Sequence, residues 1–236
     1  MKNRTSYALI PARGGSKRIP KKNIKDFHGK PIIAYSIEIA KKANIFDNII
    51  VSTDNKNIAD ISQKYGASIP YYRPKEISDD YSTLFDVVDH SLANISYDYK
   101  YCCLILPTSP FLTTKYLLKG MEMIKENDAL FSFSASPLSS PFQRSFMINK
   151  NKKSKMFFPN EFKKRSQDFE VAYQDNGQFY WIDIEKYAKC KNKNFFENQS
   201  IPIVTPKYLS HDIDTLEDWE YAELMFSAIK NKFEKL

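Results

Sequence analysis

The chain is poor in cysteine and lacks any long apolar segment. Of its 236 residues three are cysteines, with Cys102 and Cys103 adjacent in an apolar stretch and Cys190 isolated. No C-x-x-C pair is present, so the sequence indicates neither a disulfide framework nor a zinc site. No apolar run approaches the ~20 residues of a membrane span. The N-terminal stretch has a charged start but lacks an apolar stretch long enough for a signal peptide. We therefore expect a cytoplasmic protein with reduced thiols and no membrane partner.

Several widespread catalytic and phosphate-binding motifs are also missing. There is no G-x-x-x-x-G-K-[ST], because Pro31 follows Gly29 and Lys30, and no G-x-G-x-x-G follows the first strand. The three histidines are scattered, and no Ser–His–Asp, Cys–His or zinc-hydrolase pattern supports hydrolysis. The formal charge of +7 indicates an anionic partner. Because no arginine-rich helix, zinc-finger spacing or aromatic RNA-binding signature accompanies that charge, we do not expect nucleic acid.

Predicted strands and helices alternate along most of the chain. Strands are expected at residues 7–10, 48–53, 68–72, 101–106, 129–134 and 177–182, and helices at 31–43, 55–65, 82–94, 114–126 and 215–233. This rhythm predicts one α/β domain over residues 1–236, with a mostly parallel sheet and helices on both faces. Ligands of such sheets bind beyond the carboxyl ends of the strands. Residues 135–175 are rich in Ser, Pro, Lys and Phe, and we expect an inserted arm there.

The first strand leads into a loop that combines glycines with positive charge. Residues 11–22 read PARGGSKRIPKK. Gly14 and Gly15 allow an anion to approach main-chain N–H groups. The charge that amides cannot supply comes from the side chains of Arg13, Lys17, Arg18, Lys21 and Lys22. The sequence predicts a seat for a polyanion such as a nucleoside triphosphate. A solvated basic surface loop is the simpler alternative.

Two acidic segments have competing interpretations. In the run YYRPKEISDDYST at 71–83, Asp79 and Asp80 either take part in ligand binding or cap the helix expected near Ser82. In an extended segment, Asp212 and Asp214 would point the same way with Cα atoms roughly 6.5–7 Å apart, so they could share Mg²⁺. The alternative is that Asp214 merely helps to cap the terminal helix. Thr215 is expected as its N-cap, with Asp218 closing a capping box.

Together, the basic loop, the R-P…S-D run, the P-T-S-P turn at 107–110 and the H-D-I-D segment at 211–214 resemble cytidylyltransferases that activate nonulosonic (sialic-type) sugars. The resemblance covers nearly the whole chain. The segments RSQD at 165–168 and AYQDNGQFYW at 172–181 are similar to the pseudaminate branch of that family. Leu106 is a departure, because sialate-type members tend to carry glutamine before the turn. Legionaminate and N-acetylneuraminate remain alternative sugars, and a non-catalytic basic nucleotide- or nucleic-acid-binding protein is the alternative from another class.

The resemblance implies a Rossmann-like three-layer α/β/α nucleotide-diphospho-sugar transferase fold and a homodimer formed through the arm. It implies transfer of CMP from CTP to the anomeric hydroxyl of the sugar, with release of pyrophosphate. The implied nucleotide contacts are Ala12, Arg13, Gly14, Gly15, Ser16, Lys17, Lys22, Asn23, Arg73, Asp80 and Thr83. The implied sugar contacts are Thr108, Ser109, Arg165, Gln167, Asp175, Gln178 and Tyr180, with the Arg165 guanidinium on the sugar carboxylate. Asp212 and Asp214 would hold Mg²⁺ or Mn²⁺, and Arg13, Lys22 and Asp214 would be catalytic.

Overall fold

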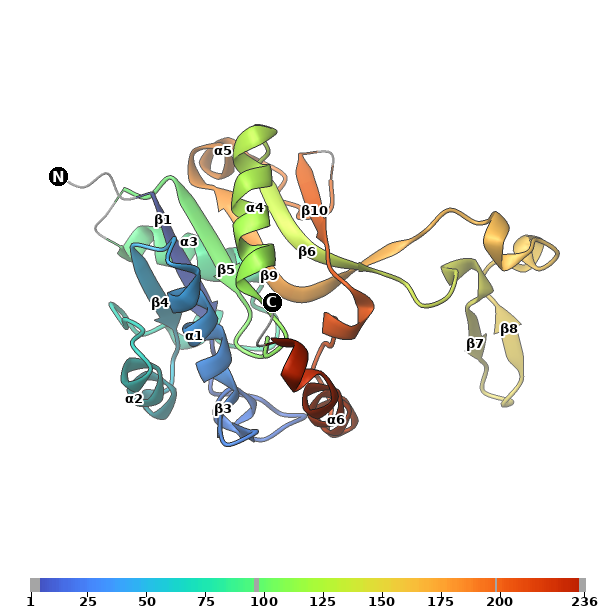
Figure 1. Cartoon of the computed structure of the whole chain (residues 1–236), viewed down its shortest axis with the longest axis horizontal. Helices are drawn as coiled ribbons and strands as arrows, with labels where there is room; N and C mark the ends of the chain where they lie inside the picture. Colours follow the sequence, from blue (N-terminus) through green and yellow to red (C-terminus); the bar gives the residue numbers. More distant parts are fainter. Residues whose placement is uncertain (1–4, 96–97, 198, 234–236) are drawn as a thin grey trace.

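A computed structural model describes residues 5–95, 98–197 and 199–233, and it contains one central sheet of six strands in the order β10-β6-β9-β5-β1-β4 (Figure 1). The strands are β1 (Ser6–Pro11), β4 (Asn48–Ser52), β5 (Tyr101–Ile105), β6 (Phe131–Pro137), β9 (Tyr173–Asp183) and β10 (Ser200–Val204). β9 runs antiparallel to both of its neighbours, β5 and β6, whereas the other pairings are parallel. The mostly parallel sheet is therefore confirmed.

Helices cover both faces of this sheet, as the three-layer prediction requires. One apolar core joins the sheet to α1 (Ile32–Ala43), α2 (Lys56–Lys64) and α4 (Thr114–Glu126). A second core on the opposite face joins it to α3 (Leu84–Asn94) and α5 (Ile184–Lys189). A third cluster packs α6 (Leu216–Phe233) against the β2–β3 hairpin (Asp26–Phe27 and Lys30–Pro31). α6 thereby lies next to the loop after β1, although the two segments are at opposite ends of the sequence.

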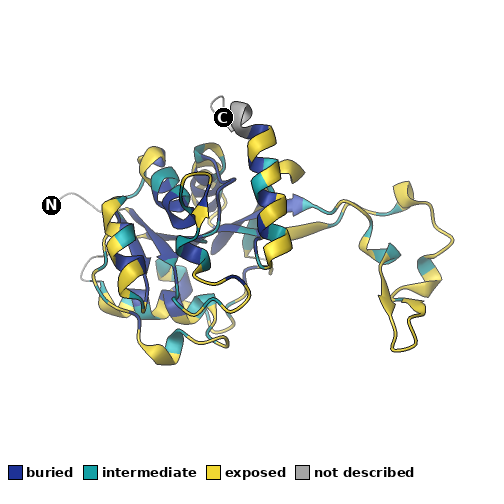
Figure 2. Cartoon of the chain, turned by 90° about the horizontal axis from the view of Figure 1, so that it is seen from below, coloured by how far each residue is buried: buried dark blue, intermediate teal, exposed yellow. Residues whose placement is uncertain are grey.

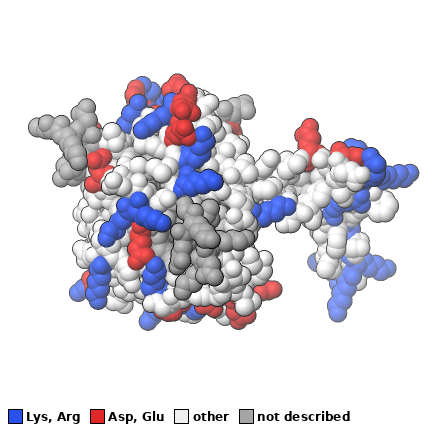
Figure 3. Space-filling model, viewed as in Figure 1, with Lys and Arg blue, Asp and Glu red and all other residues white. Residues whose placement is uncertain are grey.

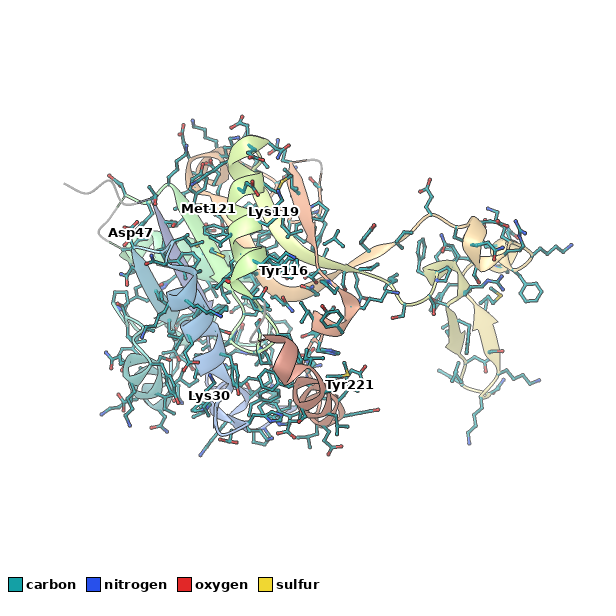
Figure 4. All side chains as sticks on the ribbon, viewed as in Figure 1. Lys30, Asp47, Tyr116, Lys119, Met121 and Tyr221 are labelled. Atoms are coloured by element: carbon teal, nitrogen blue, oxygen red, sulfur yellow. The ribbon has the colours of Figure 1, made fainter. Side chains whose placement is uncertain are left out.

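α4 packs closely against the sheet at Gly120. A Cβ atom there would lie 2.6 Å from Cδ1 of Trp181 and 2.8 Å from Cε2 of Phe179, both on β9. The indole N–H of Trp181 also donates a hydrogen bond to the carbonyl of Leu117, at 3.0 Å. Of the residues flanking Gly120, Met121 is buried and Lys119 is exposed (Figure 4). The glycine thus allows α4 to approach the centre of the sheet.

The structure differs from the sequence prediction in several short elements. Residues 68–72 do not form a strand: Ser68 makes an isolated bridge to Ile50 of β4, and Tyr72 makes another to Thr53, the residue after β4. β10 and α5 were not predicted, and α3 begins at Leu84 because Thr83 is its N-cap. Short 3-10 turns, not predicted either, lie at Lys22–Ile24 (η1), Lys75–Ile77 (η2), Phe142–Arg144 (η3), Pro159–Glu161 (η4), Ser166–Asp168 (η5) and Lys207–Leu209 (η6).

The inserted arm leaves the sheet where β6 ends and returns where β9 begins. It spans residues 138–172 and contains the small antiparallel pair β7 (Phe146–Ile148) and β8 (Ser154–Met156). Figure 2 shows that the arm projects from the body and is exposed along most of its length. It carries eight Lys or Arg against three Asp or Glu, and Figure 3 shows basic side chains gathered at its far end. Among the described helices, none is both long and apolar enough to cross a membrane.

Candidate active site

A cleft of about 300 Å³ opens beyond the carboxyl ends of β1 and β5. Four segments that are distant in sequence line it: the loop after β1, the stretch before α3, the turn after β5 and the segment before α6. The predicted site residues in its lining are Arg13, Ser16, Lys17, Lys22, Asn23, Arg73, Asp80, Thr83, Thr108, Asp212 and Asp214. Ligand binding at the strand ends, inferred from the α/β rhythm, thus has a matching cavity.

The loop after β1 is held by its own backbone and by the end of β4. The N–H of buried Ala12 donates to the carbonyl of Ser52 at 2.9 Å. Gly14 donates its N–H to the Asp54 carboxylate at 2.8 Å. A Cβ on Gly14 would come within 2.9 Å of the Asn55 side chain, so glycine is needed for this close approach. Because Asp54 takes the Gly14 N–H, that amide serves to anchor the loop in this structure.

The cations of the loop point across the cleft to acidic groups on both sides. Arg13 lies 2.8 Å and Lys17 2.5 Å from the Asp80 carboxylate. On the other side, Arg18 lies 2.9 Å and Lys22 3.2 Å from the Asp214 carboxylate. The loop therefore gathers four positive charges in one cavity, which is an arrangement suited to a polyanion.

Two further hydrogen bonds, made by Asn23 and Lys22, hold this loop in position. Asn23 is buried, and its amide donates to the carbonyl of Arg13 at 2.9 Å. Lys22 donates from Nζ to the carbonyl of Ile213 at 2.7 Å in addition to its ion pair. The loop and the segment before α6 are thus joined directly, although the sequence separates them by almost the whole chain.

The stretch before α3 resolves the ambiguity between Asp79 and Asp80. The Asp79 carboxylate accepts hydrogen bonds from the N–H groups of Tyr81 and Ser82 and from the Ser82 hydroxyl, so it shapes the turn. Asp80 instead faces the loop cations, and its hydrogen bonds to Lys17 and Arg13 lower its pKa. The hydroxyl of Thr83 caps α3 by accepting from Asp86 N–H at 3.2 Å, within a capping box. The cap of α3 is therefore Thr83, whereas Asp79 shapes the turn before the helix, and neither Asp79 nor Asp80 caps it.

Arg73 is the most enclosed cation of the cleft. The residue is 5% exposed, and its Nε donates to the Ser78 hydroxyl at 3.1 Å. Its Nη2 has no hydrogen-bond partner among the described residues. Burial lowers the pKa of this guanidinium, which the nearby Asp54 partly offsets. A buried donor without a partner at a cleft wall is a candidate ligand contact.

The segment before α6 places Asp212 and Asp214 at the cleft. The capping box of α6 is formed by Thr215 and Asp218, because Asp218 accepts from the Thr215 N–H at 2.7 Å and Thr215 Oγ1 accepts from the Asp218 N–H at 3.2 Å. The Asp214 side chain is therefore left to face Lys22 and Arg18, and the alternative that it merely caps the helix is wrong. Desolvation, followed by the charge of Asp214, raises the pKa of Asp212.

Contacts from β9 and β6 hold this segment in place. Asn176 donates to the Thr205 hydroxyl at 2.7 Å, and Thr205 donates to the carbonyl of Ala135. Gln178 is buried, and its amide donates to the carbonyl of Leu209. Gln178 does not line the cleft, so its observed contact is one that positions the chain leading to Asp212.

The remaining predicted sugar contacts fall in three places. Thr108 lines the cleft, whereas Ser109 is buried beside the carbonyls of residues 177 and 178. The Tyr180 hydroxyl donates to Asp175, and the negative charge of Asp175 also raises the pKa of Asp212. The other two, Arg165 and Gln167, lie on the arm, and Arg165 forms a two-point ion pair with Asp168 at 2.9 Å. They are not among the residues that line the cleft of their own chain.

Sequence reasoning did not predict most of the apolar wall of the cleft, nor the role of Asp54 as the anchor of its loop. The wall is formed by Ile77, Leu84, Val87 and Leu106. Leu84 and Val87 have helical spacing, which indicates core rather than a site, so no sequence signal distinguished them. The anchor, Asp54, lies two residues after the end of β4, and its position near a strand end was the available signal.

The chemistry available here is that of binding and charge stabilisation. Four cations, two neighbouring carboxylates and an apolar wall share one cavity. Within the described ranges, no three His, Cys, Asp or Glu residues gather in a way that could hold a metal ion. A divalent cation bound at Asp212 and Asp214 would therefore need ligands from a substrate, as Mg²⁺ commonly does with phosphates.

Comparison with known proteins agrees with this description. The family model described as "Cytidylyltransferase" matches residues 7–204. The pseudaminic acid cytidylyltransferase of Campylobacter jejuni is 39% identical over 231 residues, which cover 97% of each chain. The CMP-N,N'-diacetyllegionaminic acid synthase of Legionella pneumophila is 32% identical and covers 92% of this chain and 94% of that protein. A structure of CMP:2-keto-3-deoxy-manno-octonic acid synthetase complexed with CTP aligns with a TM-score of 0.69 at 14% identity, covering 95% of this chain and 99% of that one, which shows the shared fold.

Proposed function

Because the chain belongs to the cytidylyltransferase family, we propose that it transfers CMP from CTP to the anomeric hydroxyl of a nonulosonic acid, with pseudaminic acid as its sugar. The observation that carries this proposal is the meeting of the basic loop with Asp212 and Asp214 in one cleft. The relative with 39% identity, named for pseudaminic acid, supports the choice of sugar.

The reaction we propose is an in-line displacement at the α-phosphorus of CTP. A bond forms between the sugar's C2 oxygen and that phosphorus, the bond to the β-phosphate bridge breaks, and pyrophosphate leaves. Arg13 and Lys22 stabilise the charge that grows on the phosphates, and Asn23 keeps Arg13 in place through its carbonyl. Catalysis would thus rest on positioning and electrostatics. The hydroxyl proton leaves to a base that we do not assign.

We propose that Asp212 and Asp214 hold Mg²⁺, with Mn²⁺ as a substitute. Their donor set fits a hard cation, because Mg²⁺ is commonly bound by one or two carboxylates together with phosphates and water. The raised pKa of Asp212 supports the proposal, since two carboxylates that repel each other gain from a cation between them. When bound, Mg²⁺ would neutralise charge on the phosphates and the leaving group.

We propose that the cytidine lies against the wall that includes Arg73. The unpartnered Nη2 of this buried guanidinium is a donor available to the nucleotide, and Leu84 and Val87 give the wall an apolar face. Leu106 adds another apolar surface beside Thr108 at the turn after β5. An apolar side chain at this position disfavours a sugar that needs an amide partner there, which supports a sugar other than N-acetylneuraminate.

We further propose a homodimer in which the arm of one protomer completes the site of the other. The arm projects from the body and exposes Phe146, Ile148, Phe157 and Phe162, which is unusual for a segment surrounded by water (Figure 2). Arg165 lies on this arm and not at its own cleft. If it binds the sugar carboxylate, as its fork geometry allows, it must do so in a partner. Arg165 would then break its ion pair with Asp168 and bind the sugar carboxylate in its place.

We place this reaction in the cytoplasm. The three cysteines are free thiols, and Cys102 and Cys103 are buried in the core, as expected where the surroundings are reducing. Separation of cytosolic and membrane fractions with an antibody to the chain would test this placement. Recovery of the chain mainly with membranes would contradict it.

The function is tested by a panel of substrates. The purified protein is incubated with Mg²⁺, one of CTP, UTP, ATP or dTTP, and one of pseudaminic, legionaminic or N-acetylneuraminic acid, and products are read by mass spectrometry. Of the four nucleotides, we expect only CTP to give a nucleotide-sugar. Of the three sugars, we expect pseudaminic acid to react fastest. A different sugar preference would correct the substrate. Failure to form any nucleotide-sugar, together with salt-sensitive binding to nucleic acid that needs no Mg²⁺, would favour the non-catalytic alternative.

A further inference from the structure

Four cations of the loop after β1 pair with two acidic residues, and only one of these two belongs to the proposed metal site. Arg18 and Lys22 pair with Asp214, which belongs to the proposed metal site. Arg13 and Lys17 pair with Asp80, which lies on the opposite side of the same cleft. Asp80 is thus the acidic partner that the metal proposal does not use.

The Asp80 carboxylate takes no part in the turn before α3 or in the cap of that helix, so it is available to pair with the two cations. The hydrogen bonds of the turn before α3 go to the neighbouring Asp79, and the helix cap is Thr83. One carboxylate oxygen of Asp80 takes Arg13 at 2.8 Å and the other takes Lys17 at 2.5 Å. The carbonyl of Asp79 also accepts from Arg13, so the guanidinium is held from two sides. Asp80 therefore occupies both cations with the two oxygens of one carboxylate.

We propose that Asp80 is an internal counter-anion, which holds Arg13 and Lys17 in position and gives them up only to a ligand with enough negative charge to replace it. This inference deepens the proposed function, because the ligand would be the polyphosphate of the nucleotide. A triphosphate or pyrophosphate can replace the carboxylate at both cations, whereas uncharged cytidine cannot. Asp80 would thus lower the affinity for polyphosphate, favour release of pyrophosphate and sharpen the requirement for a fully charged ligand.

This role predicts an effect opposite to that of a ligand contact. If Asp80 touched the ribose or base, as an implied nucleotide contact would, its removal should weaken binding. If it competes with phosphate for the cations, its removal should strengthen binding of phosphate-containing ligands and leave cytidine unaffected. Both ion pairs are partly exposed, with the Asp80 side chain 39% exposed, so the gain should be modest and should shrink as salt rises.

The test is calorimetric titration with inorganic pyrophosphate and, separately, with cytidine, in buffer without divalent cations. We expect Asp80→Asn to bind pyrophosphate about three- to tenfold more tightly than the wild type at low salt, with cytidine affinity unchanged. Asp60→Asn removes the same charge from the exposed face of α2 and should bind pyrophosphate like the wild type. In a Lys17→Ala background, the gain from Asp80→Asn should become smaller, because one of the two competing pairs is already absent.

Unchanged or weaker pyrophosphate binding by Asp80→Asn would overturn the inference, and so would an equal gain in Asp60→Asn. Unfolding curves of both variants would show whether a loss of binding reflects a loss of structure. The result is distinct from that of the substrate panel, since pyrophosphate binding is measured without turnover. Tighter binding in a protein that forms no CMP-sugar would uphold the counter-anion and reject the proposed reaction.

Discussion

Lys22 and Asp214 are 192 positions apart in sequence, yet the ammonium of one lies 3.2 Å from the carboxylate of the other. Lys22 begins the 3-10 turn after the first loop, and Asp214 directly precedes the residues that cap α6. The fold brings them together by packing α6 against the β2–β3 hairpin. This contact joins the proposed phosphate-binding loop to the proposed metal site, and both line the same cleft.

The first prediction concerns how much the charged Asp212 carboxylate destabilises the folded protein when no divalent cation is bound. Its folded pKa is raised by desolvation and then by Asp214, so the charged form is disfavoured in the folded protein. This cost is absent below the unfolded pKa, grows as pH rises above it, and is complete once pH has passed the folded pKa. Without divalent cations, Asp212→Asn should therefore raise the melting temperature at pH 7, by about 2 °C because solvent screens the site.

The difference between Asp212→Asn and the wild type should shrink as pH falls below the ordinary range of an aspartate, where both side chains are uncharged. Differential scanning calorimetry at several pH values in the presence of a chelator measures this directly. A melting temperature at pH 7 that is lower in Asp212→Asn than in the wild type would show that the carboxylate is stabilising, contrary to the direction of its pKa.

The second prediction concerns the arm. Arg165→Ala and Asp214→Asn should each be nearly inactive, but for different reasons. If Arg165 acts on the partner's site, mixing and reassembling the two variants restores one complete site in each mixed dimer. Random pairing then gives about a quarter of wild-type activity. If Arg165 acts on its own cleft, every site in the mixture lacks one of the two residues and no activity returns.

A conservative change at Arg165 separates sugar binding from general loss of function. Arg165→Lys should raise the KM for the sugar about tenfold or more, because a bidentate hydrogen bond to a carboxylate is lost, while the KM for CTP stays close to that of the wild type. Steady-state kinetics with each substrate varied in turn gives both values. An equal rise in both would remove Arg165 from the carboxylate role.

The third prediction concerns sugar choice at Leu106. This side chain lines the cleft beside Thr108, where sialate-type members of the family tend to carry glutamine. Leu106→Gln should shift the ratio of kcat/KM toward N-acetylneuraminate and away from pseudaminate, by about tenfold. Leu106→Met keeps an apolar side chain of similar size and serves as the control. An unchanged ratio in Leu106→Gln would show that this position does not read the sugar.

The fourth prediction is structural and runs against helix propensity. Replacing a helical glycine by alanine usually stabilises by about 1 kcal/mol. At Gly120 the new methyl would collide with Trp181 and Phe179, and overpacking of this kind costs about 1–3 kcal/mol. We expect Gly120→Ala to melt below the wild type, and Lys119→Ala, on the exposed side of the same helix, to melt close to it. A higher melting temperature for Gly120→Ala would show that the indole moves aside.

Much of the fold could be predicted because its signals are local. β5 is apolar at every position, as a strand buried on both faces must be, and Thr215 with Asp218 forms the expected capping box. Residues 68–72 were predicted as a strand from the same kind of signal, but only Ser68 and Tyr72 bridge to β4 and the residue after it. β10 was missed because it is short, contains a proline and lies at the edge of the sheet.

The sequence was sufficient to predict most residues of the site, but not which of them contact one another. Loop cations and strand-end aspartates could be identified from composition and position. Sequence could not separate Asp79 from Asp80, because either carboxylate can cap a turn, and only the fold shows which one faces Arg13. Nor could sequence place Arg165, since the direction in which an inserted arm leaves the sheet depends on how β6 and β9 extend.

The most direct measurement is the release of pyrophosphate from CTP in the presence of Mg²⁺ and pseudaminic acid, compared between the wild type and Asp214→Asn. The loop and the aspartates are proposed to hold the same magnesium-bearing triphosphate, so losing one carboxylate should slow release by about 100-fold or more. Glu217→Gln, in the first turn of α6, offers a matched loss of charge outside the cleft lining and should release pyrophosphate at the wild-type rate. Undiminished release by Asp214→Asn would contradict the account.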